Sequence, residues 1–177
     1  EMVATFRARV TEADKLIEAK EARPAREILR DVVDRLARLV AGEEIGIKTG
    51  FLPIDNEGGL YPGEMVLVCG ETGLGKSTLA LNLVHRAVQQ HPVAVISLEM
   101  SGQAWMDRLL SLDLTIDRRT FRSRSLLTEG VMRRLAANMP RLGNLPLWIC
   151  DDGQASVDDI RRIVKHLADR HGVRMVI

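Results

Sequence analysis

One contiguous stretch of the chain has the residue types and the spacing needed to bind phosphate groups. It reads Gly70-Glu71-Thr72-Gly73-Leu74-Gly75-Lys76-Ser77 and fits the pattern G-x-x-x-x-G-K-[ST], directly after an apolar run and at the start of a helical pattern. Glycines let the backbone wrap closely around a phosphate chain with its N–H groups pointing inward, and the positive end of the following helix faces the same anion. The ammonium of Lys76 is expected to reach the β- and γ-phosphates of ATP, and the hydroxyl of Ser77 to bind Mg²⁺. The predicted nucleotide-binding residues are Gly70, Glu71, Thr72, Gly73, Leu74, Gly75, Lys76, Ser77 and Thr78.

A carboxylate, Glu99, follows the next predicted strand, which covers Val93–Leu98. The C-terminal ends of parallel strands lie on one rim of a sheet, where ligands bind, so Glu99 and Lys76 are expected to face the same pocket. A carboxylate in that place can orient and deprotonate the water that attacks the γ-phosphate. The spacing is equally compatible with a solvated carboxylate beside a helix N-cap, and both interpretations stand at this point.

Residues from Gly46 onward alternate between short β-rich apolar runs and helical patterns, which predicts a parallel α/β sheet covered by helices. The predicted buried strands are Met65–Cys69, Val93–Leu98, Leu147–Cys150 and Val173–Ile177. The predicted helices are Gly75–Gln90, Gly102–Leu112, Glu129–Arg141 and Val157–His171. Ser101 and Thr128 are expected to be N-caps, and Ser156 with Asp159 resembles a capping box.

The first 45 residues are poor in glycine and show helical periodicity. Apolar residues recur at helical spacing over Val3–Ile17, and a second helix is predicted over Pro24–Val40, ending before Gly42. Apolar side chains form a continuous stripe along this second helix, so it must dock on another surface. Its own domain and a neighbouring subunit both fit that requirement. The predicted domains are an N-terminal helical linker segment, residues 1–45, and an α/β domain, residues 46–177.

Composition and charge limit the classes of protein only weakly. The 177 residues are 46% apolar and 28% charged, which is typical of a globular protein. The formal net charge of +1 gives no argument for nucleic acid, and an aromatic content of 3% excludes an extensive stacking platform for bases. No signal peptide and no long apolar stretch occurs, which predicts a cytoplasmic protein without a membrane partner. Cys69 and Cys150 each end an apolar run and are expected to be buried, reduced thiols.

Several short motifs follow one another in an order that resembles the motor domain of DnaB-type replicative DNA helicases. The motifs are Thr49-Gly50-Phe51, Ile54-Asp55, Gly59-Leu60, Pro62-Gly63-Glu64, the glycine-rich loop and Ser97-Leu98-Glu99-Met100-Ser101. The loop is shared by many nucleoside triphosphatases, whereas the Ser-Leu-Glu-Met-Ser stretch points to this family. The likeness continues more weakly through Ile116-Asp117, Leu145–Ile149 and Val157–Ile177.

The resemblance implies a RecA-like P-loop NTPase fold and an ATP-hydrolysing helicase that moves along single-stranded DNA and unwinds duplexes during replication. Members of the family use the glutamate of this motif as the catalytic base, which gives Glu99 that role and places Lys76 beside it in the catalytic site. The helix Pro24–Val40 matches the family's linker helix, which packs on the adjacent subunit of a hexameric ring. Primase and a helicase loader are further partners that the resemblance implies.

Two departures from the family pattern leave other functions open. The loop carries Glu71-Thr72-Gly73-Leu74 where the family often has Arg-Pro-Ser-Met, and this resembles other RecA-like ATPases, such as recombinases and clock-type ring proteins. The family's magnesium-binding aspartate follows a strand like Val173–Ile177, where the sequence ends. We therefore expect a fragment or truncated chain that is inactive alone, with the aspartate, the DNA-binding elements and the arginine finger lying further on. A pure assembly module and a small-molecule P-loop kinase are the remaining alternatives. A kinase would need a lid and an acceptor pocket, and the sequence shows a pattern for neither.

Other polar clusters are interpreted as structural. The four histidines share no ligand spacing, so no metal is assigned to them. The segment Asp151-Asp152-Gly153 fits either the pocket or a loop leading to a helix cap. A set of arginines is typical of solvated helix faces and turns, with a DNA path as the alternative. These arginines are Arg118, Arg119, Arg122, Arg124, Arg133, Arg134, Arg161 and Arg162.

Overall fold

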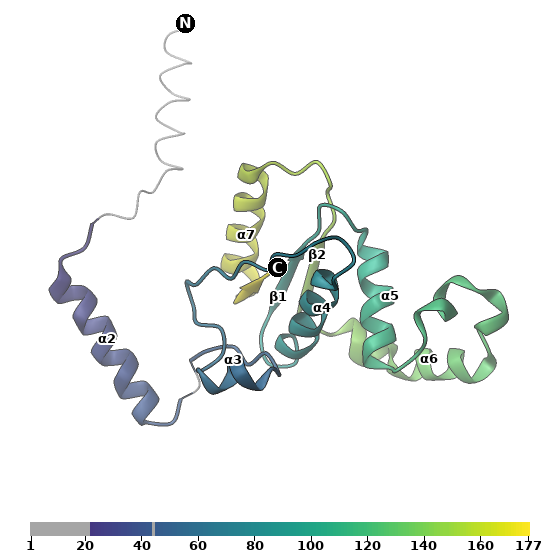
Figure 1. Cartoon of the computed structure of the whole chain (residues 1–177), viewed down its shortest axis with the longest axis horizontal. Helices are drawn as coiled ribbons and strands as arrows, with labels where there is room; N and C mark the ends of the chain where they lie inside the picture. The colour runs from purple at the N-terminus through teal and green to yellow at the C-terminus, as the bar shows by residue number, and fades with distance from the viewer. Residues whose placement is uncertain (1–21, 44) are drawn as a thin grey trace, which may run out of the picture. The chain divides into compact units, whose positions relative to one another are not determined.

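The computed structural model describes residues 22–43 and 45–177 (Figure 1). The chain divides into two compact units, Glu1–Glu43 and Glu44–Ile177. The helix predicted over Val3–Ile17 lies outside the described residues. Among the described residues, no helix combines the length and the apolar character needed to cross a bilayer.

In the first unit, helix α2 covers Ala25–Val40, as its periodicity predicted. Pro24 precedes it, where a missing N–H is tolerated, and the Pro24 carbonyl accepts a hydrogen bond of 2.9 Å from the N–H of Glu27. Gly42 follows with a φ of 82°, a left-handed conformation that favours glycine and ends the helix. Large apolar side chains recur along one face of α2. They belong to Ile28, Leu29, Val32, Val33, Leu36, Leu39 and Val40.

The second unit is built on a parallel sheet of three strands in the order β2-β1-β3. Strand β1 covers Val93–Ile96, β2 covers Leu147–Cys150 and β3 covers Met175–Val176. The central strand β1 pairs with β2 along its whole length and with β3 over two residues. Because both edges and both faces of β1 are covered, its first three residues are buried. Three of the predicted strands are thus confirmed in place, although β1 and β3 are shorter than predicted.

The fourth predicted strand, Met65–Cys69, is wrong. The structure forms no strand there, and its side chains are exposed, with Met65 at 91% and Leu67 at 77%. An apolar run becomes a strand when its N–H and C=O groups pair with a neighbour, and β1 already pairs on both edges. The segment pairs with neither outer edge of the sheet, the four-residue edge of β2 or the two-residue edge of β3. Cys69 is consequently exposed rather than buried, Cys150 is half-buried, and both thiols are free.

Helices lie where the sequence predicted them, because local signals begin and end them. They are α4 (Lys76–Ala87), α5 (Gly102–Asp113), α6 (Glu129–Gly143) and α7 (Val157–His171). Ser101 accepts a hydrogen bond from the N–H of Ala104, Thr128 caps α6 in the same way, and Ser156 with Asp159 forms a complete capping box. Three short elements had no periodic signal. They are α3 (Leu52–Asn56) and the 3₁₀ helices η1 (Arg118–Arg122) and η2 (Arg124–Leu126).

Helices α4 and α5 pack with the sheet around one apolar core. Val84 of α4, Val95 of β1 and Leu109 of α5 lie fully buried in it. A second cluster, centred on Leu114 and Leu142, joins the end of α5 to α6 and η1. Because α5 is packed on both sides, the loop between β1 and α5 is held at both ends.

A nearly buried carboxylate ties three helices together. The Asp113 side chain at the end of α5 is 7% exposed, and its Oδ1 lies 3.0 Å from Nε2 of His85 on α4. Its Oδ2 accepts a hydrogen bond from Arg141 on α6. The hydrogen bond from Arg141 is the main reason that the pKa of Asp113 is lowered below its usual value.

Asp113→Asn is expected to lower the free energy of unfolding by about 2 kcal/mol at pH 7, the typical worth of a hydrogen bond to a charged group. Because the folded state lowers the pKa of Asp113, this contribution is present above the unfolded pKa of about 3.9 and is lost as the pH falls through the folded pKa. Urea titrations of wild type and variant from pH 7 to pH 3 measure the difference. Asp158→Asn, which breaks an exposed pair with Arg161, is the control. A stability difference that does not shrink at acidic pH would contradict the ionic origin.

Candidate nucleotide-binding site

The glycine-rich loop connects the exposed segment before it to the N-terminus of α4. Gly73 and Gly75 have φ angles of 89° and 91°, in the left-handed region. A Cβ atom on either glycine would meet nothing within 4 Å, so the backbone conformation and not the space requires glycine there. Gly75 is the N-cap of α4, and the first N–H groups of that helix therefore border the loop.

The side chain of Lys76 lies inside this loop. Its Nζ donates hydrogen bonds of 2.7 Å to the carbonyl of Gly70 and 2.9 Å to that of Glu71. The ammonium is thus held within the curve of the loop, where a phosphate chain would place its negative charge. Leu74, between the two glycines, is 71% exposed.

The loop forms one side of a cavity of about 400 Å³. The loop side is lined by Thr72, Gly73, Gly75, Lys76, Ser77 and Thr78. Glu99, Arg108 and Arg118 complete the lining. The carboxylate of Glu99 therefore lies on the same cavity as Lys76, as expected, although only Glu99 follows a strand of the sheet, since the segment before the loop forms none.

The turn that carries Glu99 is closed by its own hydrogen bonds. The hydroxyl of Ser97 donates to the carbonyl of Met100 at 2.6 Å and accepts from the N–H of Met100 at 3.0 Å. Ser101 then caps α5 directly after the turn. Glu99 itself is exposed on a turn with two fixed ends.

The alternatives for Asp151 and Asp152 are decided by their hydrogen bonds. Oδ2 of Asp151, beyond the end of β2, accepts a hydrogen bond of 2.6 Å from the N–H of Gly102, the first residue of α5. Asp152 accepts a hydrogen bond from the N–H of Gln154 within its own turn. Neither residue lines the loop cavity. Asp151 thus caps a helix, although that helix is α5 and not the one that follows it in sequence.

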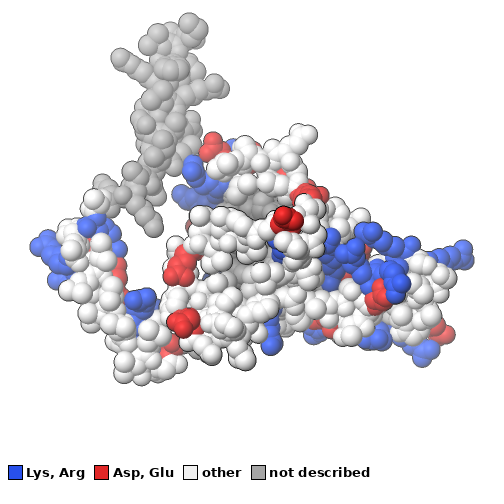
Figure 2. All heavy atoms as spheres, in the orientation of Figure 1, with Lys and Arg blue, Asp and Glu red and all other residues white. Residues whose placement is uncertain are grey.

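Two arginines of the cavity were not predicted as site residues. Arg108 was not singled out, and Arg118 was interpreted as part of a solvated turn. Figure 2 shows basic side chains gathered over the end of this unit that carries α5, η1 and α6. Arg108 lies near Glu99 because α5 begins right after the turn that carries Glu99. This closeness along the chain could have been used to predict Arg108 as a site residue. Arg118 reaches the cavity from η1, and no local sequence pattern predicts that placement.

No metal site built from protein side chains is found in the described part of the chain, where no three His, Cys, Asp or Glu residues come together. Mg²⁺ in nucleotide sites is usually held by one or two side chains and by the phosphates of the nucleotide. The hydroxyl-bearing Ser77 at the start of α4 is the residue suited to that role.

The parallel sheet, the glycine-rich loop and the cavity at the strand ends define a P-loop nucleotide-binding domain of the RecA-like α/β class. Residues 46–177 match the family described as DnaB-like helicase C terminal domain. The chain therefore belongs to the DnaB-like helicase family.

Curated relatives agree with this membership. The chain is 34% identical to the replicative DNA helicase DnaB of Leifsonia xyli over 139 residues, which cover 77% of this chain and 30% of the relative. It is 30% identical to the DnaB of Geobacillus stearothermophilus, with the same coverage. The chain thus spans less than a third of the length of these relatives.

The fold is similar to that of two solved structures. One is described as an ATPase domain, with a TM-score of 0.73, 22% identity and coverage of 88% of this chain and 56% of that one. The other is described as a DnaB-like replicative helicase and its interactions with primase, with a TM-score of 0.66 and 20% identity, covering 97% of this chain and 47% of that one. At these identities the likeness concerns the fold.

Proposed function

We propose that this chain is part of the motor domain of a replicative DNA helicase, in which ATP hydrolysis drives translocation on single-stranded DNA and duplex unwinding. The observation that carries the proposal is that Lys76, Ser77 and Glu99 line the same cavity in a chain of the DnaB-like family. The domains proposed for the whole are the linker segment 1–45 and the ATPase part 46–177.

The loop and α4 would bind the phosphates of ATP through backbone N–H groups, and Lys76 would neutralise charge on the β- and γ-phosphates. Mg²⁺ would be held by the hydroxyl of Ser77 together with phosphate oxygens and would supply further neutralisation of charge. Glu99 would accept a proton from the water that attacks the γ-phosphorus, so that the P–O bond to ADP breaks and inorganic phosphate forms.

Phosphate release by the full-length protein, with and without single-stranded DNA, tests this function. Stimulation of hydrolysis by DNA supports a helicase or a recombinase, and displacement of a strand from a forked duplex separates the two. Family membership favours the helicase over a recombinase or a clock-type ring ATPase. ATP hydrolysis that DNA leaves unchanged would contradict the proposal.

The assembly that we propose is a hexameric ring joined through the helix at residues 24–40. Burying one large apolar side chain is worth about 1.5–3 kcal/mol, so the apolar face of α2 needs a covering surface. A head-to-tail contact between subunits supplies one and closes into a ring when the rotation allows. Single-stranded DNA, primase and a helicase loader are the further partners proposed. The cytoplasm is the proposed location, and the free thiols Cys69 and Cys150 agree with a reducing compartment.

Val33→Asp with Leu36→Asp is expected to disrupt the ring, because two carboxylates on the apolar face of α2 oppose its burial. Light scattering of the full-length protein measures the mass of the assembly, and nucleotide binding checks that the loop stays intact. Arg30→Asp with Arg38→Asp places two carboxylates on the polar face of the same helix and is the control. Assembly of the apolar-face variant to the wild-type mass would show that α2 is not needed for the ring.

A further inference from the structure

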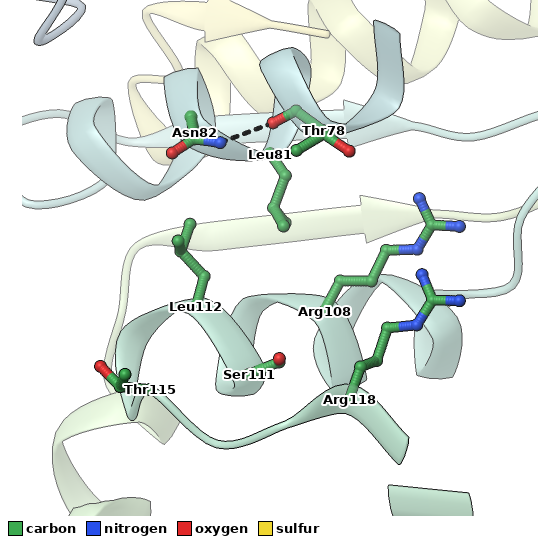
Figure 3. A pocket seen from close by; sticks show the side chains of 8 residues that line it. All are labelled: Thr78, Leu81, Asn82, Arg108, Ser111, Leu112, Thr115 and Arg118. Carbon is green, nitrogen blue, oxygen red and sulfur yellow. Dashed lines mark hydrogen bonds between the residues drawn. The ribbon is translucent and has the colours of Figure 1, made fainter. Parts of the chain in front are cut away.

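Arg108 and Arg118 belong to two neighbouring cavities at once. Both line the loop cavity and also a second cavity of about 480 Å³ between α4 and α5 (Figure 3). The second cavity is lined further by Leu81 and Asn82 of α4 and by Leu112 of α5. In Figure 3 the two guanidinium groups extend from separate elements toward the same end of this cavity. The two arginines therefore stand on the wall that the cavities share.

Neither guanidinium group is neutralised within the described part of the chain, where no ion pair or hydrogen bond joins Arg108 or Arg118 to a partner. Nearby arginines behave differently. Arg119 pairs with Asp117 at 2.7 Å, and Arg141 pairs with Asp113. The hydrogen bonds of the Arg119 pair lower the pKa of Asp117 to about 2. Asp117, the acidic residue next to Arg118 in the sequence, is thus paired with Arg119 and not with Arg118.

The charge of the loop cavity is consequently unbalanced. Lys76, Arg108 and Arg118 contribute three positive charges against the single carboxylate of Glu99. Two like charges on one wall repel each other, and an anion between them relieves that repulsion. Guanidinium groups suit a phosphate because their fork of N–H donors matches its oxygens.

Lys76 is tied to the loop carbonyls on one side of the cavity, whereas the two arginines approach from α5 and η1. A triphosphate held by the loop carries one more phosphate and more negative charge than a diphosphate, and the guanidinium groups of Arg108 and Arg118 line the same cavity. We propose that Arg118, together with Arg108, binds the terminal phosphate of the nucleotide within the same chain and sets the preference for ATP over ADP. This inference rests on the proposed nucleotide site.

Calorimetric titration of the full-length protein with ADP and with a non-hydrolysable ATP analogue tests the inference. Arg118→Gln is the main variant because the residue is exposed and its replacement leaves the core untouched. It is expected to weaken binding of the analogue about tenfold, the effect of losing one hydrogen bond to a charged group, and to leave ADP binding nearly unchanged. Arg108→Gln is expected to shift the ratio of the two affinities in the same direction.

Arg124→Gln is the matched control, since Arg124 is an exposed arginine of the neighbouring η2 that lines neither cavity. An unchanged ratio of the two affinities in Arg118→Gln, or an equal loss of both, would overturn the inference. A lower affinity for single-stranded DNA with an unchanged ratio would assign Arg118 to a DNA surface, which also overturns it. Wild-type protein that binds neither nucleotide would instead refute the nucleotide site itself.

Discussion

Lys76→Ala in the full-length protein is expected to weaken ATP binding by at least about a hundredfold, because the ammonium's charge-assisted hydrogen bonds to the β- and γ-phosphates, worth about 1.5–3 kcal/mol each, are lost. The ammonium lies within the curve of the glycine-rich loop, bonded to the carbonyls of Gly70 and Glu71. Its removal takes away the main side-chain charge available to the β- and γ-phosphates. Titration with a fluorescent ATP analogue, followed by a phosphate-release assay, measures the loss.

The hydrogen bonds from Lys76 to the carbonyls of Gly70 and Glu71 complicate the interpretation of Lys76→Ala, since the loop itself loses a support. Lys76→Arg keeps the positive charge and a donor, so partial recovery of affinity would assign the effect to charge. Lys165→Ala on α7 removes an exposed lysine outside both cavities and is the control. Unchanged ATP binding and turnover in Lys76→Ala would contradict the site.

Contiguous motifs made the loop side of this site predictable. Lys76 and Ser77 are fixed by a pattern of adjacent residues, and the strand before Glu99 places that carboxylate at the C-terminal edge of the sheet, where ligands bind in parallel sheets. The helix boundaries near the site were predictable for the same reason, because caps such as Ser101 act within a few residues of the chain.

The other wall of the site depended on distant packing. Arg118 follows the loop by some forty positions and sits on a five-residue 3₁₀ helix without apolar periodicity. Its place is set by Leu114 and Ile116, which fix the end of α5 to α6 and so direct η1 to the cavity. The sequence alone therefore shows that Arg118 is charged but does not show that it lines the cavity.

The segment Met65–Cys69 shows the opposite failure, a local signal without a partner. Its β-rich apolar side chains predict a buried strand, yet strand formation depends on a free ladder edge. In the described residues β1 is paired on both sides, and the segment pairs with neither of the two outer edges, that of β2 and that of β3. The sequence of one segment cannot predict whether a neighbouring strand is available to pair with it.

Glu99→Gln in the full-length protein is expected to lower the rate of ATP hydrolysis by roughly two to four orders of magnitude, the range for losing a positioned general base. Glutamine keeps the size of the side chain and one acceptor oxygen but cannot accept the proton of the attacking water. Ser97 and Ser101 hold the two ends of the turn, so its conformation should survive the substitution.

Nucleotide affinity should stay close to wild type in Glu99→Gln, because the phosphates are bound from the loop side of the cavity by Lys76 and backbone N–H groups. Single-turnover hydrolysis with enzyme in excess separates the chemical step from product release. Glu57→Gln, an exposed glutamate outside the cavity, is the control. Hydrolysis near the wild-type rate would show that Glu99 is a solvated carboxylate beside the N-cap of α5. A large loss of hydrolysis with intact binding would instead make it the base, since no other carboxylate lines the described cavity.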